Sequence, residues 1–197
     1  MASLLPFLLF AFVASITPGP TNILVLSHSS RRGLIATLPI IFGACAAAAL
    51  IVLVVGLGAG ETLLRFPRVQ QAMAWAGVLW LSWLAWQIFR SPPPSLVPKS
   101  QEQSLSVFGA ALLQLVNPKV WMMAVAVVSV FVGGGDKTLR LLVLSLAFLL
   151  VSLPCMTLWA LLGVGSARLL SSPQAFKRMN AALALLLLLS AWLAVLV

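Results

Sequence analysis

Six runs of about twenty mostly apolar residues follow one another along the chain and constrain its fold more than any other feature. A helix needs about 20 such residues to cross the hydrocarbon core of a bilayer. Only 8% of the 197 residues are charged, whereas a soluble domain carries about 25%. The sequence therefore predicts an all-α integral membrane protein, a single membrane domain over residues 1–197. The predicted transmembrane helices are Leu4–Leu26, Leu34–Leu57, Val69–Phe89, Ser106–Val132, Leu139–Val164 and Phe176–Leu196.

A proline-rich segment divides the six runs into two sets of three. Ser91-Pro92-Pro93-Pro94-Ser95 and Pro98 predict a stiff, solvated linker over about residues 91–105. The halves before and after it, about 1–90 and 106–197, each hold an odd number of predicted helices, so they cross the membrane in opposite directions. We therefore predict two inverted three-helix repeats, an architecture common among transporters.

Proline motifs interrupt the first helix of each half. Pro18-Gly19-Pro20 lies inside the first run and Asn117-Pro118-Lys119 inside the fourth. Proline has no backbone donor and does not continue a helix, so we expect helices one and four to be broken there. At 1.5 Å per residue each proline lies roughly 18 to 21 Å into a core about 30 Å thick. Because the halves are inverted, the two breaks should meet near the midplane and form one site.

Lys119 is the charge that argues most strongly for function. An ionised lysine deep in a span is costly and usually marks a pathway, although its long stem could also snorkel to the headgroups. Polar side chains near the breaks, Thr21 among them, are individually more typical of hydrogen bonds between helices. As a set they form a plausible cage around a substrate. The predicted substrate-binding residues are Thr17, Pro18, Gly19, Pro20, Asn22, Gln114, Asn117, Pro118 and Lys119.

The basic charge indicates a lipid bilayer as partner and not nucleic acid. The formal net charge is +9, but the twelve Lys and Arg are scattered between apolar runs without a basic patch that aromatic residues interleave. The first, third and fifth predicted loops carry seven of them and the second and fourth carry four. By the positive-inside rule, this difference places both termini outside the cytoplasm. No Lys or Arg precedes the first run, so we interpret it as a span and not as a cleavable signal peptide.

Other function classes lack the residues they need. The three acidic residues, Glu61, Glu102 and Asp136, fall in predicted loops. Proton coupling through a membrane-embedded acid is therefore unsupported, which leaves the substrate, Lys119, His28 or water as carriers. His28, beside Arg31 and Arg32, is more typical of a loop or interface histidine than of a proton relay. No nucleotide-binding loop, catalytic triad or metal cluster is present, so we expect neither an enzyme nor a cofactor.

Two alternatives to a metabolite transporter stay open. A membrane thiol-redox carrier would use Cys45 and Cys155, which lie in predicted helices two and five. Neither cysteine has the electropositive sequence neighbours typical of reactive thiols. A metal-ion exporter would need acidic or histidine ligands within the spans, where the sequence places no acid. Whether the protein is a homo-oligomer is also left open.

The motifs together resemble the lysine exporter family (LysE/RhtB type) of bacterial amino-acid exporters. The matching residues are Thr17 to Asn22, Gly33, Gly43, Asn117-Pro118-Lys119, Pro154, Trp159 and Gly163. The resemblance runs essentially end to end. It implies export of amino acids or related small metabolites across the bacterial inner membrane, driven by an ion gradient without ATP. Many members carry a polar or acidic residue a few positions after Gly43, where this chain has alanines up to Ala49; the difference favours neutral amino acids over lysine or arginine.

Overall fold

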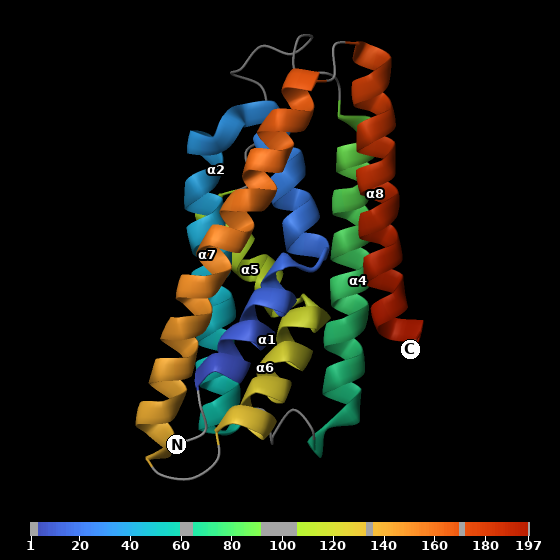
Figure 1. The fold of residues 1–197 in the computed structure, drawn as a ribbon. Coiled ribbons are helices and arrows are strands. Elements are labelled where there is room, and N and C mark those ends of the chain that lie inside the picture. Colours follow the sequence, from blue (N-terminus) through green and yellow to red (C-terminus); the bar gives the residue numbers. More distant parts are fainter. Residues whose placement is uncertain (1–3, 60–64, 92–105, 133–135, 170–171, 197) are drawn as a thin grey trace.

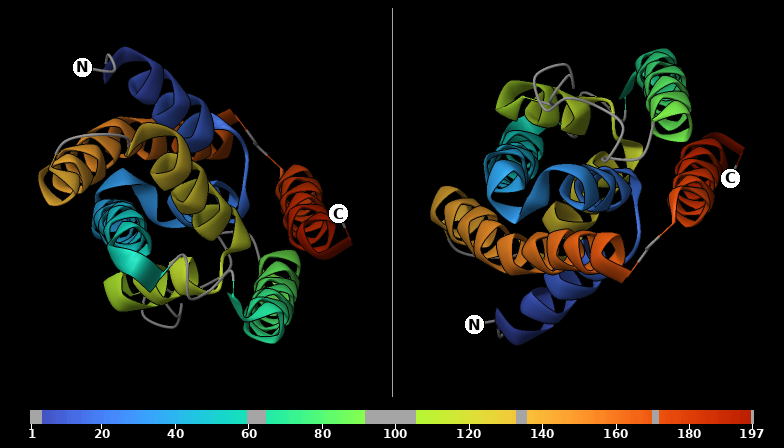
Figure 2. Two further views of the ribbon diagram at one scale, coloured as in Figure 1. Left: turned by 90° about the horizontal axis from the view of Figure 1, so that it is seen from below. Right: turned by 90° about the horizontal axis from the view of Figure 1, so that it is seen from above.

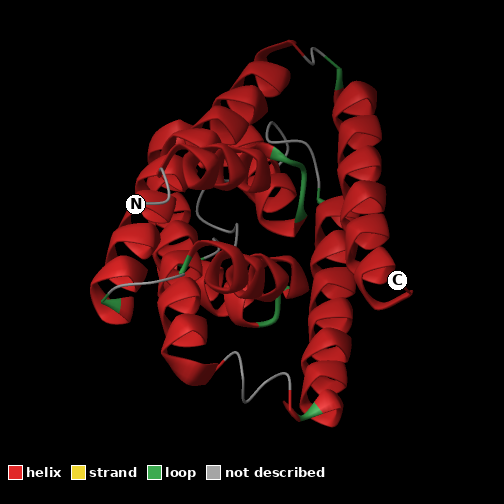
Figure 3. Cartoon of the chain, turned by 60° about the horizontal axis from the view of Figure 1, so that its bottom comes forward, coloured by secondary structure: helices red, strands yellow, loops and turns green. Residues whose placement is uncertain are grey.

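The computed structural model describes residues 4–59, 65–91, 106–132, 136–169 and 172–196, and these residues form helices and loops without a strand (Figure 3). The predicted all-α fold is therefore confirmed for this part of the chain. The helices are α1 (Leu4–Ile16), α2 (Pro20–Val54) with a π-helical turn η1 (Val55–Ala59), α4 (Pro67–Arg90), α5 (Val107–Leu115), α6 (Pro118–Phe131), α7 (Lys137–Leu169) and α8 (Pro173–Leu196). Most of the predicted linker, residues 92–105, lies outside the described residues, as do Glu61 and Glu102.

Both predicted helix breaks are confirmed. α1 ends at Ile16, and α2 begins with Pro20 after Gly19, whose extended backbone (φ −162°, ψ 177°) starts the new helix. α5 ends at Leu115, and α6 begins with Pro118, its axis bent by 65° from that of α5. A proline in the first helical position fits because that residue needs no hydrogen-bonded N–H. The proline motifs thus split one helix in each half into two shorter ones.

α2 reverses direction at Gly33. The glycine has φ 81° and ψ 174°, a left-handed conformation that L side chains rarely adopt. Ala48, Val52 and other residues late in α2 consequently pack with Phe7 and Ala11 of α1, so the second arm returns past the first break. The reversal is visible at the top of Figure 1, where the blue ribbon turns downward.

The helix before this turn is longer than the sequence predicted. The first span was expected to end at Leu26 because Ser29, Ser30 and the arginines are polar. In the structure Ser29 Oγ donates to Leu26 O (3.0 Å) and Ser30 Oγ to Ser27 O (2.8 Å). These serines remain helical because their hydroxyls bond to carbonyls of the same helix. The helix therefore ends at the glycine and not at the first polar residue.

Three described segments are long and apolar enough to cross a membrane: Pro20–Ala59, Pro67–Arg90 and Lys137–Ser166. The bent pair α5 and α6 makes a fourth. A straight helix of 40 residues, the length of Pro20–Ala59, would extend about 60 Å, twice the bilayer core; the Gly33 turn divides it into two arms. The six-span inverted repeat and its domain boundaries stay predictions. Figure 1 places the start of α1 and the end of α8 toward the same end of the molecule, as an even number of spans requires.

The core has two main parts, which meet near the breaks. One cluster joins α1, the second arm of α2, α6 and α7 through residues such as Phe7, Val52, Val127 and Phe148. The other joins α4 and α8 and includes Ile23 of α2 and Leu113 of α5. In both views of Figure 2, α4 and α8 lie side by side, set apart from the remaining helices. The two breaks thus lie between a large helical bundle and a two-helix layer.

The outward-facing surface is apolar. Trp80, Trp83 and Trp86 of α4 are 42%, 50% and 53% exposed, and Leu146 and Leu150 of α7 are 57% and 61% exposed. A soluble monomer rarely exposes apolar patches of this extent. An apolar surface of this extent is typical of a protein that interacts with a membrane.

Glycines allow the close helix contacts around the breaks. A Cβ on Gly163 of α7 would lie 2.1 Å from Ser29 Oγ and 2.4 Å from Leu26 O, and a Cβ on Gly77 of α4 would lie 2.1 Å from Val116 O. Real Cβ atoms do not approach backbone oxygens this closely, so each glycine lets its helix touch a neighbouring backbone.

We expect Gly163→Ala to lower stability and Gly165→Ala not to, although both lie in α7. A Cβ at Gly165 meets nothing within 4 Å, while the added methyl at Gly163 overpacks the contact with α2, at a cost of about 1–3 kcal/mol. Both substitutions gain the same helix propensity, about 1 kcal/mol. Thermal unfolding of the two purified variants in detergent measures the difference. Equal melting temperatures would contradict the close contact.

Candidate functional site

The carboxyl end of α1 is held by side chains from three other helices. The last carbonyls of a helix have no partner within it. Here Asn22 Nδ2 of α2 donates to Ser15 O (2.9 Å), Trp159 Nε1 of α7 donates to Ile16 O (3.1 Å), and Lys119 Nζ of α6 donates to Thr17 O (2.8 Å). Polar backbone freed by the break is thus satisfied by protein, as a membrane interior requires.

Side chains also satisfy backbone groups at the second break. Trp121 Nε1 donates to Leu115 O (2.8 Å), one of the last carbonyls of α5. Asn117 caps α6, with its Oδ1 accepting from the backbone N–H of Lys119 (3.2 Å). An Asn cap satisfies one of the donors at a helix start.

Three buried polar side chains connect the two breaks. Gln114 Nε2 and Asn117 Nδ2 donate to Thr21 Oγ1 at 3.1 Å and 3.2 Å, and Asn117 Nδ2 also lies 3.3 Å from Gln114 Oε1. Thr21, Gln114 and Asn117 are 7%, 2% and 1% exposed. Residues 93 to 96 positions apart in sequence thus form one hydrogen-bonded cluster between the two halves.

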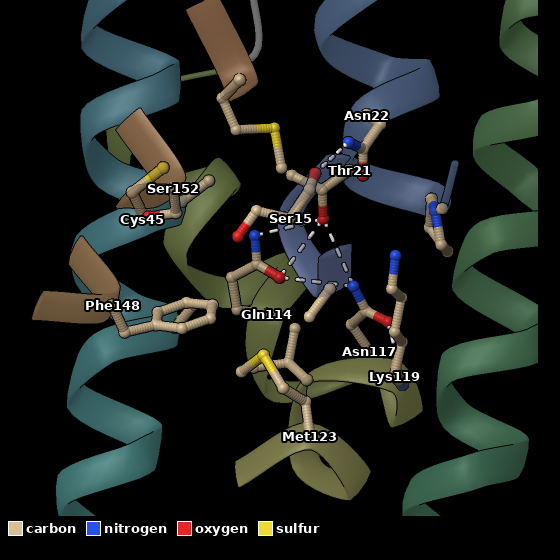
Figure 4. A pocket seen from close by; sticks show the side chains of 17 residues that line it. Ser15, Thr21, Asn22, Cys45, Gln114, Asn117, Lys119, Met123, Phe148 and Ser152 are labelled. Atoms are coloured by element: carbon tan, nitrogen blue, oxygen red, sulfur yellow. Dashed lines mark hydrogen bonds between the residues drawn. The ribbon is translucent and has the colours of Figure 1, made fainter. Parts of the chain in front are cut away.

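A cavity of about 40 Å³ lies beside this cluster (Figure 4). One wall is polar and comes from the breaks: Ser15, Thr21, Asn22, Gln114, Asn117 and Lys119. The other is mainly apolar and comes from the second arm of α2, α6 and α7: Ala44, Ala48, Val120, Met123, Phe148 and Met156. At about 10–15 Å³ per water position the cavity has room for roughly three waters.

One polar group in the cavity wall has no protein partner. Ser15 is 6% exposed, and its Oγ is buried without a hydrogen bond among the described residues. Buried polar groups are normally satisfied. The hydroxyl therefore indicates where a ligand or an ordered water would bind.

The structure brings most of the predicted binding residues together. Gly19, Pro20, Asn22, Gln114, Asn117 and Lys119 all line the cavity. Thr17 contributes its carbonyl to Lys119, while its hydroxyl is turned back to Val13 O. Pro18 and Pro118 do not line the cavity; their effect is to end and begin helices. The binding role of the whole set stays a prediction.

Several residues at the cavity were not predicted from sequence. The sequence does not single out Ser15, because one serine in an apolar run follows no periodicity or motif. Its position in the last turn before a proline break is the one signal that points to it. Thr21 was expected in the polar set around the breaks but not in the narrower set of binding residues, and it is the centre of the polar cluster. Phe148 and Met156 come from α7, and only the tertiary fold places them there.

The other titratable residues lie differently. Cys45 lines the cavity and Cys155 does not; both are buried free thiols. His28 lies near the Gly33 turn, its Nδ1 2.9 Å from Thr37 Oγ1. Asp136 caps the start of α7 through the N–H groups of Thr138 and Leu139. Across the described ranges, no group of three or more His, Cys, Asp or Glu is arranged to hold a metal.

Known proteins are similar to this chain in sequence over most of its length. Cysteine/O-acetylserine efflux proteins of Escherichia coli O157:H7 and Shigella flexneri serotype 5b (strain 8401) are 30% and 31% identical over 184 and 189 residues. These matches cover 92% of this chain in each case and 92% and 94% of the relatives. The protein of the same description from Klebsiella pneumoniae is 31% identical over 127 residues, 64% of this chain and 63% of its own. No solved structure matches.

The family comparison covers most of the chain. The family model described as LysE type translocator matches residues 12–196. That range includes both helix breaks and all the residues that the preceding paragraphs place around the cavity. The chain therefore belongs to the LysE type translocator family.

Proposed function

We propose that the protein is a secondary-active exporter of small neutral amino acids in the bacterial inner membrane. The main support for this proposal is the cavity between the two helix breaks, which has polar groups on one wall and apolar groups on the other. Relatives that match along most of the chain are named for efflux of cysteine and O-acetylserine, both small neutral amino acids.

The helix ends suit the two charges of an amino acid. The carboxyl end of α1 presents carbonyls and a partial negative charge, which attract an ammonium. The amino ends of α2 and α6, with Gly19, Pro20 and Asn117 at the cavity, carry partial positive charge, which attracts a carboxylate. The polar wall thus accommodates the part that all amino acids share.

The apolar wall would determine which substrate side chains the cavity accepts. Met123, Phe148 and Met156 offer thioether and aromatic contacts, and Ala44 and Ala48 leave space beside them. Methionine adapts to irregular shapes and contacts sulfur and aromatic groups favourably. Among the described residues, no Asp or Glu lines the cavity, which favours neutral side chains over those of lysine and arginine.

Transport follows from alternating access around the breaks. The cavity has room for only about three waters, less than an amino acid needs, so the two inverted halves must rock apart to admit one from either side. The contact of Gly77 with Val116 lies at the second break and would slide during this motion. The direction of transport is taken from relatives named for efflux: an ion gradient would drive substrate from the cytoplasmic to the periplasmic side, with both termini proposed to be periplasmic.

Purified protein in liposomes tests this function. We expect counterflow of labelled cysteine and O-acetylserine, weak counterflow of arginine, and concentrative transport only when an ion gradient is imposed. Empty liposomes are the control for leakage. Equal transport of all three amino acids, or none above the control, would contradict the proposal.

A second prediction concerns the unpartnered serine. We expect Ser15→Ala to raise the KM for transport roughly fivefold, the equivalent of one hydrogen bond of about 1 kcal/mol, without lowering the melting temperature. Ser145→Ala is the matched control, because Ser145 is also buried with an unpartnered Oγ but does not line the cavity. If the two variants transport alike, Ser15 does not contact substrate.

The thiol-redox alternative is tested through Cys155 alone, since a dithiol couple needs both cysteines. We expect Cys155→Ala to retain amino-acid transport, because Cys155 lies outside the cavity wall. Activity is measured in the same liposomes with and without a thiol oxidant. Loss of all activity in this variant, together with unchanged folding, would favour the redox carrier.

A further inference from the structure

The ammonium of Lys119 is bound by a backbone carbonyl at the end of a helix. Its Nζ lies 2.8 Å from Thr17 O, just past the end of α1, where the partial charge of the helix is negative. Asp136, the acidic residue of the described chain, is engaged at the start of α7. The lysine charge is therefore met by a helix end and not by a carboxylate.

The Thr17 carbonyl differs from its two neighbours in how it is held. Ser15 O and Ile16 O accept from Asn22 and from the Trp159 indole, both neutral donors. Thr17 O accepts from a charged amine on a flexible four-carbon stem. Of the three carbonyls, this one has the only charged partner, and that partner sits on the longest and most flexible side chain.

Gly19 makes room for that partner. A Cβ at this position would lie 3.0 Å from Nζ and 3.1 Å from Cδ of Lys119. The backbone of Gly19 is extended (φ −162°), a conformation open to any residue, so the glycine is explained by the space that the lysine needs. A primary amine at the end of α1 is thus built into the packing of the first break.

We propose that the carboxyl end of α1 is an ammonium site whose resident occupant is Lys119, and that the substrate ammonium displaces it. This inference rests on the proposed function. On displacement, the Lys119 ammonium pairs with the substrate carboxylate, so neither charge is left without a partner in a low-dielectric site. Lys119 is then a specificity-determining residue that requires both charged groups of an α-amino acid.

The same exchange explains how the empty carrier stays closed. Thr17 lies at the first break and Lys119 at the second, so their hydrogen bond joins the two halves across 102 residues of sequence. A ligand with only an ammonium would release the lysine without giving it a partner. A ligand with only a carboxylate would leave the Thr17 carbonyl bare.

The site is tested by removing most of the Lys119 side chain and supplying the removed part as a free ligand. Lys119→Ala removes the equivalent of n-propylammonium and leaves the Cβ. We expect n-propylammonium to raise the melting temperature of this purified variant in a saturable way, with an apparent affinity at least about tenfold tighter than for wild type. The isosteric neutral 1-propanol should not do so, and Lys137→Ala, at the start of α7 far from the cavity, should behave as wild type does. Equal responses to propylammonium and propanol would overturn the proposal.

A second variant covers the case in which Lys119→Ala does not fold. Lys119→Met keeps most of the stem and removes the charge. In competition against labelled cysteine, wild type should discriminate roughly a hundredfold between cysteine and its methyl ester, which lacks the carboxylate, and Lys119→Met only a few-fold. Unchanged discrimination in the variant would refute the exchange. Failure of wild type to bind cysteine would instead refute the proposed function, while the propylammonium result would still report on the ammonium site.

Discussion

The requirement that backbone polar groups be satisfied inside a membrane determines the arrangement around the breaks. Two proline motifs free carbonyls and N–H groups at a depth where lipid offers no hydrogen bonds. Side chains from α2, α6 and α7 satisfy the end of α1, and Trp121 and Asn117 satisfy the second break. Because each break needs donors from elsewhere in the chain, the breaks and the surrounding helices must be close-packed. The glycine contacts of α4 and α7 provide that packing.

The sequence predicted what depends on local chemistry. Proline and glycine fix where helices end, so both breaks were found, and six of the nine predicted binding residues line the cavity. The sequence could not predict which helix lies opposite each freed carbonyl. The bond from Trp159 to Ile16 O, 143 residues away in sequence, is of this kind. The predicted end of the first span at Leu26 was wrong. Ser29 and Ser30 are polar, but they bond to carbonyls of their own helix, which continues to Gly33.

Lys119 illustrates how the sequence can single out a residue without giving a full account of its environment. Its charge, its depth and the motif around it singled it out, and the expected partner was a substrate carboxylate. The structure instead places its ammonium on the Thr17 carbonyl. An ionised lysine within a span needs a partner, so a lysine proposed to pair with a substrate must have another acceptor when the substrate is absent. Sequence alone identifies the charge, whereas the structure identifies this acceptor.

A transporter without an acidic residue at its site must handle the substrate ammonium by other means. Carbonyls at a helix end can do this, because their partial charge is fixed in direction and does not depend on protonation. Such a site is weaker than a carboxylate. A weaker site suits an exporter, which must release substrate as well as bind it. If Lys119 competes for the same carbonyl, as we propose, release and reclosure become one event: as the amino acid leaves, the lysine returns to Thr17 and joins the two breaks again.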